Sequence, residues 1–173
     1  AALAVASGHA AEFLCFHALL QPGDEFVAAK KLYGGSLNQM GEAFLKFGWE
    51  TRFVDADDPE NVRAAMDDKT RCVFIESLAN PGGVVSDISA IADVAHAGGV
   101  PLIVDNTMAT PALCRPFDFG ADIVTHSTTK FLNGHGNAVG GVIVDSGKFD
   151  WKAQGDKFAS LTRPNGSYHG AVL

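Results

Sequence analysis

The residues with the clearest chemical potential gather around Lys130. Three hydroxyl side chains, Ser127, Thr128 and Thr129, directly precede this lysine, and the β-branched run at 121–125 before them is typical of a buried strand. In an open α/β sheet the carboxyl ends of the strands face the ligand crevice. A lysine at that edge could hold a phosphate or form a Schiff base, whereas a solvated loop lysine would do neither. The neighbouring segments must decide between these interpretations.

Three more candidate residues follow other strand-like runs. Asp105 ends the apolar run 101–105, Asn80 lies in the turn after the run 71–76, and Tyr33 follows the run 25–29. Tyr33 could pack over its turn or stack on a flat ligand, and an isolated Asp at a strand end is often only a turn residue. Because the carboxyl ends of parallel strands share one edge, Asp105 and Lys130 are expected to converge.

A helix is expected to begin after Ser7, which can cap it. The backbone N–H groups of Gly8 and His9 would then point out of the positive end of the helix, where an anion can bind. When the Ser-Gly pair is considered alone, a helix cap that binds no ligand is the commoner explanation.

The elements that must position these residues alternate along the chain. We expect strands at 25–29, 49–54, 71–76, 101–105, 121–125 and 141–145, and helices at 8–20, 36–47, 59–66 and 87–96. This alternation predicts an α/β fold of three layers, with a mainly parallel sheet wrapped by helices. The glycines at 134–140 lead into a strand, so they do not match a dinucleotide loop. After 148 the periodicity fades, and we expect a loop.

Composition narrows the class of protein. The chain has 173 residues, 47% of them hydrophobic, and a net charge of −7, which fits one globular domain. Without a Lys/Arg cluster or an apolar run of about 18 residues, neither nucleic acid nor a membrane is expected as a partner. Cys15, Cys72 and Cys114 should be buried free thiols, which favours a cytoplasmic location. Since neither these cysteines nor the histidines have ligand spacing, no metal is expected. The start at Ala1 suggests an incomplete fragment of a longer chain.

Together the candidate residues match pyridoxal 5′-phosphate (PLP) as a cofactor. Lys130 would bind the cofactor carbon C4′ as a Schiff base, and Ser127 and Thr129 would hold the phosphate together with the N–H groups at the helix start. Tyr33 would cover the ring, and Asp105 would stabilise positive charge on the ring nitrogen. Lys130, Tyr33 and Asp105 are therefore the expected catalytic residues.

The sequence also resembles the Cys/Met-metabolism family of PLP-dependent enzymes. The resemblance rests on the segments 7–11, 33–35, 76–81, 104–106 and 126–130, and the segment 131–151 is similar to the O-acetylhomoserine sulfhydrylase branch. It implies the aspartate-aminotransferase type of fold (PLP fold type I), with residues 1–173 as an incomplete large PLP-binding domain. In that family Asn80 would contact the 3′-oxygen of the cofactor. His9 stands where several relatives carry methionine.

The resemblance further implies a transferase of methionine biosynthesis, which converts O-acetyl-L-homoserine and sulfide to L-homocysteine and acetate. An amino-acid substrate and a homotetramer of the full-length chain are expected. The alternatives are another activity of the family, cystathionine γ-synthase or methionine γ-lyase, or a non-catalytic α/β binding domain. Relatives bind the substrate carboxylate through an arginine in a C-terminal domain, so residues 1–173 alone are expected to be inactive.

Overall fold

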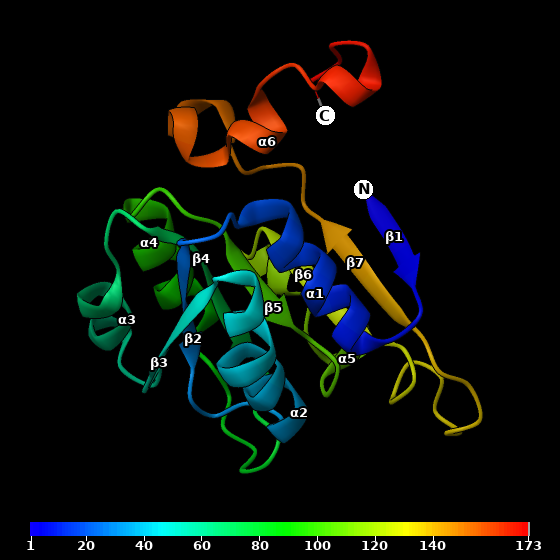
Figure 1. The fold of residues 1–173 in the computed structure, drawn as a ribbon. Coiled ribbons are helices and arrows are strands. Elements are labelled where there is room, and N and C mark those ends of the chain that lie inside the picture. The colour runs from blue at the N-terminus through cyan, green and yellow to red at the C-terminus, as the bar shows by residue number, and fades with distance from the viewer. Residues whose placement is uncertain (173) are drawn as a thin grey trace.

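The computed structural model describes residues 1–172 and contains one seven-stranded sheet (Figure 1). The strands lie in the order β1-β7-β6-β5-β4-β2-β3. Their bounds are β1 (Ala2–Val5), β2 (Glu25–Ala29), β3 (Glu50–Val54), β4 (Thr70–Glu76), β5 (Leu102–Asp105), β6 (Ile123–Ser127) and β7 (Gly141–Asp145).

Helices join most of these strands. The α-helices are α1 (Gly8–Leu19), α2 (Gly34–Asn38), α3 (Pro59–Ala65), α4 (Ile88–Ala97), α5 (Thr110–Leu113) and α6 (Ala159–Thr162). Helix α1 packs on β6 and β7, and α4 packs on β5 (Figure 1). The predicted start of α1 is confirmed, since the Ser7 hydroxyl accepts a hydrogen bond from the Ala10 N–H at 3.0 Å.

The predicted α/β sheet is confirmed, and one of its sides ends in antiparallel pairings. Strands β3, β2, β4, β5 and β6 pair in parallel, whereas β7 pairs antiparallel with both β6 and β1. Every residue of β2 and β5 is buried. Because successive side chains of a strand point to opposite faces, complete burial means that other elements cover both faces of the sheet.

Several expectations are corrected by the structure. The helix expected at 36–47 is not regular: α2 passes into a π-helix at Gln39–Ala43 and a 3-10 turn at Phe44–Phe47. The strand expected at 121–125 runs from Ile123 to Ser127, because it continues pairing with β7 as far as Gly141. Strand β1 was not predicted; four residues form it by pairing with the free edge of β7.

Two further expectations also need correction. The segment after 148 is not a plain loop. It contains 3-10 turns at Lys152–Phe158 and Gly166–Tyr168 and the short helix α6. It also buries Phe158 against Trp151, with ring centroids 5.1 Å apart. Single aromatic anchors of this kind leave no periodic pattern for sequence reasoning to find.

Cys15 and Cys72 are buried free thiols as predicted, but Cys114 is only half-buried.

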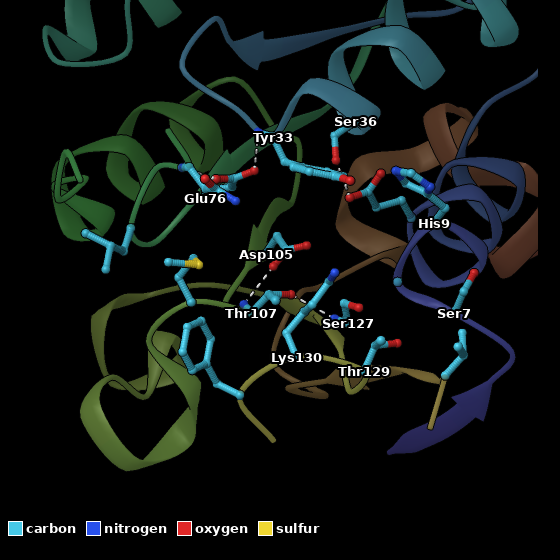
Figure 2. A pocket seen from close by; sticks show the side chains of 17 residues that line it. Ser7, His9, Tyr33, Ser36, Glu76, Asp105, Thr107, Ser127, Thr129 and Lys130 are labelled. Carbon is cyan, nitrogen blue, oxygen red and sulfur yellow. Dashed lines mark hydrogen bonds between the residues drawn. The ribbon is translucent and has the colours of Figure 1, made fainter. Parts of the chain in front are cut away.

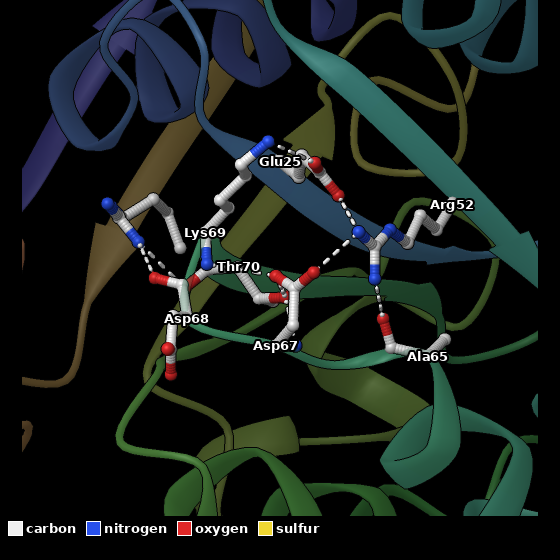
Figure 3. A network of polar contacts seen from close by, with 8 residues as sticks. Glu25, Arg52, Ala65, Asp67, Asp68, Lys69 and Thr70 are labelled. Atoms are coloured by element: carbon white, nitrogen blue, oxygen red, sulfur yellow. Dashed lines mark hydrogen bonds and ion pairs between the residues drawn. The ribbon is translucent and has the colours of Figure 1, made fainter.

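A charged network lies at the amino ends of β2 and β4 (Figure 3). Arg52 of β3 pairs with the buried Glu25 of β2, and its Nη2 atom lies 2.6 Å from Asp67 Oδ2. Arg52 also donates to the Ala65 carbonyl at 2.8 Å, and Lys69 Nζ lies 3.5 Å from Glu25 Oε1. Ion pairs therefore occupy the amino ends of these strands, and the candidate site residues lie at the carboxyl ends.

No helix in residues 1–172 has the length and apolar character needed to cross a membrane.

Candidate active site

A cavity of about 520 Å³ lies at the carboxyl ends of the parallel strands. It brings together all of the site residues predicted from the sequence, which are Gly8, His9, Tyr33, Asn80, Asp105, Ser127, Thr129 and Lys130. Further residues line it that were not among them, including Glu12, Ser36, Glu76 and Thr107.

Strand register explains why residues distant in sequence meet here. Glu76 of β4 lies opposite Asp105 of β5, and Asp105 lies opposite Thr125 of β6. Glu76 and Asp105, the last residues of β4 and β5, are thus level with Thr125, which lies two residues before the end of β6. Strand β6 ends at Ser127, and the turn after it delivers Lys130 to the same end of the sheet, as parallel topology requires.

The amino end of α1 meets the end of β6. The Ser7 hydroxyl and carbonyl accept hydrogen bonds from the N–H groups of Ala10 and Ala11, so the N–H groups of Gly8 and His9 are left without intrahelical partners. A Cβ added at Gly8 would lie 2.7 Å from the Ser127 Cβ. Glycine therefore permits the helix end to approach Ser127 closely, which places free N–H groups beside a hydroxyl and favours an anion.

The two predicted phosphate-binding hydroxyls differ in their present partners. Thr129 Oγ1 donates to the Gly140 carbonyl at 3.2 Å and accepts from the Gly140 N–H at 3.0 Å. Ser127 is held through its backbone, because its N–H donates to Thr107 Oγ1 at 2.7 Å. An anion could therefore accept from the Ser127 hydroxyl directly, whereas the Thr129 hydroxyl must first turn away from Gly140.

Lys130 extends from the turn after β6 into the cavity, on the side where Asp105 and Tyr33 lie (Figure 2). Within residues 1–172 no ion pair holds its amine. A long side chain with a free amine can reach different groups of a ligand in turn, as a covalent anchor and a proton carrier must.

Asp105 is buried, and its Oδ1 atom accepts a hydrogen bond from the Thr107 N–H at 2.7 Å. Burial raises the pKa of this carboxyl, and the hydrogen bonds from Thr107 oppose the rise. No cation within the described residues pairs with it. A buried carboxyl in a cavity that forms no ion pair with a cation of the described residues favours a ligand that brings positive charge.

One carboxyl holds two parts of the cavity wall. Glu76 Oε1 accepts from the Tyr33 N–H at 2.6 Å, and its Oε2 accepts from the Asn80 N–H at 2.9 Å. Burial raises the pKa of Glu76 to about 7, although these two hydrogen bonds lower it. The Tyr33 ring stacks on His9, with centroids 5.9 Å apart and an interplanar angle of 28°. Glu76 thus positions the aromatic residue and the amide residue together.

A second carboxyl, Glu12, lies on α1 one turn beyond Gly8. It is buried at 2% exposure, and its Oε1 atom accepts from the Ser36 hydroxyl at 2.7 Å. Burial, and next the charge of Asp105, raises the pKa of Glu12 to about 8. The sequence contained one indication that Glu12 faces the cavity: it lies four residues after Gly8, and residues i and i+4 share a helix face. That signal alone does not separate a cavity residue from a solvated one.

Comparison with known proteins identifies relatives along the whole chain. A sequence profile of the family described as Cys/Met metabolism PLP-dependent enzyme matches residues 1–172. The homocysteine synthase of Schizosaccharomyces pombe is 48% identical, over 100% of this chain and 41% of its own length. The O-acetyl-L-homoserine sulfhydrylase of Leptospira meyeri is 49% identical, over 98% of this chain and 38% of its own length.

A solved structure gives the same result for the fold. A crystal structure of a putative O-acetylhomoserine (thiol)-lyase from Campylobacter jejuni superposes with a TM-score of 0.94 at 34% identity, covering 99% of this chain and 42% of that one. That crystal contains a pyridoxyl-lysine phosphate. The expected aspartate-aminotransferase type of fold is confirmed by this similarity. The chain spans about two fifths of the length of the proteins that it matches.

Proposed function

Since the chain belongs to the Cys/Met metabolism PLP-dependent enzyme family, we propose that it forms the cofactor domain of an O-acetyl-L-homoserine sulfhydrylase. The reaction replaces the acetate of O-acetyl-L-homoserine by sulfide and yields L-homocysteine. Relatives named homocysteine synthase and O-acetyl-L-homoserine sulfhydrylase support this substrate pair. The observation that carries the proposal is the meeting of Lys130, Asp105 and the amino end of α1 in one cavity.

The cavity fits PLP on its own chemistry. The free N–H groups of Gly8 and His9 and the Ser127 hydroxyl suit a phosphate. At the other side, Asp105 is a buried carboxyl that no cation of residues 1–172 pairs with, which suits a protonated ring nitrogen. The exposed Tyr33 ring provides an aromatic face, and its stacking on His9 fixes its orientation.

Each residue then has a defined task. Lys130 would hold the cofactor covalently, and its amine would carry protons at the substrate Cα and the cofactor C4′. Asp105 holds positive charge at the ring nitrogen. Asn80, whose backbone N–H donates to Glu76, would contact the 3′-oxygen. When bound, PLP supplies an electron sink for negative charge developing beside its imine carbon.

The assembly and location of the protein are part of the same proposal. We propose a homotetramer of full-length chains, supported by exposed apolar side chains beside the cavity, at Phe131 and Val139. We propose a cytoplasmic location, because three free cysteines suit a reducing compartment. We propose that segments outside residues 1–173 bind the substrate carboxylate, so these residues alone should lack normal turnover.

A product assay tests the activity. Full-length protein with PLP and O-acetyl-L-homoserine would be given sulfide, cysteine or water as the acceptor. With sulfide as the acceptor, we expect homocysteine as the main product. Cystathionine from cysteine, or a keto acid from water, at a higher rate would instead assign a γ-synthase or a γ-lyase. The Lys130→Ala variant should lose turnover, and activity within tenfold of the parent would refute the role of Lys130.

A further inference from the structure

Glu12 is the least expected group in the cavity. Its carboxyl is almost fully buried, yet its Oε2 atom has no hydrogen-bond partner within residues 1–172. The Ser36 hydroxyl fixes the other oxygen, Oε1, at 2.7 Å. Burying an unpartnered carboxyl oxygen costs free energy. The side chain lines the cavity, so a ligand can supply the missing partner.

The surroundings of Glu12 define which partner it lacks. The titratable groups that act on it are Asp105 of β5 and Glu76 of β4, both acidic, and Cys15 lies one turn further along α1. No cation within the described residues forms an ion pair with any of these carboxyls. Three carboxyls therefore share a cavity whose described lining residues include one amine, that of Lys130, and one imidazole, that of His9.

The raised pKa of Glu12 agrees with this picture. Burial, and next the charge of Asp105, raises the pKa of Glu12 to about 8, so that without a ligand the protonated form is favoured at neutral pH. A ligand with positive charge beside Asp105 removes the second of these causes, since it neutralises Asp105, and it offers Oε2 a donor or a counter-charge. A neutral ligand of the same shape would bring neither benefit.

We propose that Glu12 is a second recognition group for the ring nitrogen of the cofactor, acting beside Asp105 and favouring a ring that carries positive charge. This inference rests on the proposed function, because it requires PLP in this cavity. Glu12 does not replace Asp105. It adds a second carboxyl at the ring-nitrogen end, held in place by Ser36, and thereby makes binding depend on the charge of the ring.

The test compares PLP with a carbocyclic analogue in which carbon replaces the ring nitrogen. Affinities of the full-length apoprotein for both probes would be measured at pH 7.5 for the parent and for Glu12→Gln, which keeps size and shape. Glu42→Gln is the matched control, because Glu42 is exposed and lies outside the cavity. Circular dichroism would establish that each variant is folded.

We expect Glu12→Gln to reduce the preference for PLP over the analogue by about tenfold, the usual effect of one charged hydrogen bond. Its affinity for the analogue should stay near that of the parent, and Glu42→Gln should change neither value. An unchanged preference in Glu12→Gln, or an equal loss of affinity for both probes, would overturn the inference. Borohydride reduction of the parent with PLP, followed by mapping of the labelled lysine, tests the proposed function separately.

Discussion

Substituting Glu12 by Gln should change how the stability of the apoprotein depends on pH. The pKa of Glu12 rises from an ordinary value of 4.5 to about 8 in the folded chain. Between these pH values the folded state binds a proton that the unfolded state has released. The Glu12 contribution to stability is therefore complete below pH 4.5 and is lost as the pH rises to 8.

The magnitude follows from the size of this shift. At about 1.4 kcal/mol per pKa unit, a rise from 4.5 to about 8 corresponds to about 5 kcal/mol at most. Glutamine does not titrate, so the variant avoids this loss. Relative to the parent, Glu12→Gln should gain stability steadily from pH 5 to pH 8 and show little further gain above pH 8.

Urea unfolding of the full-length apoprotein between pH 5 and pH 9 would measure this difference. Glu76 and Asp105 titrate in parent and variant alike, so most of their effect cancels in the comparison. Glu42→Gln again serves as the control and should follow the parent at each pH. A stability difference between parent and Glu12→Gln that stays constant from pH 5 to pH 9 would refute the buried, proton-binding state of Glu12.

Three further predictions concern other parts of the fold. Asp105→Asn should keep the fold but lower turnover by about 100-fold, roughly 2.7 kcal/mol, because an amide cannot stabilise the ring charge; kinetics and a cofactor spectrum equal to those of the parent would contradict this. Gly8→Ala should weaken PLP binding about tenfold, because the new Cβ would lie 2.7 Å from the Ser127 Cβ and displace the helix end. The affinity for pyridoxal, which has no phosphate, should stay unchanged, and equal losses of affinity for both ligands would disprove the anion site. Arg52→Met should cost about 1–3 kcal/mol in urea unfolding by leaving the buried Glu25 without its main partner, and unchanged stability would show that Lys69 suffices.

The sequence was sufficient to predict the convergence of Lys130 and Asp105. Each follows a buried apolar run, and the rule that parallel strands share their carboxyl edge does not depend on packing details. The regular alternation of runs likewise predicted the central strands. These features depend on local patterns, which a single sequence displays directly.

Other features depend on contacts between distant segments. The β1 residues become a strand only because β7 offers a free edge, and the irregular π-helix at Gln39–Ala43 shows no local signal. Glu12 was missed for the same reason. Its helix position relative to Gly8 was readable, but its burial beside Ser36 and Asp105 arises from the packing of α1, α2 and β5.

The central claim is that Lys130 binds PLP covalently in this cavity. Full-length protein would be incubated with PLP, reduced with borohydride and digested, and the modified peptide would be identified by mass spectrometry. The account predicts one phosphopyridoxyl group, located on Lys130 and absent from the Lys130→Ala variant. A label on another lysine, or no label in a folded protein that is saturated with PLP, would contradict it.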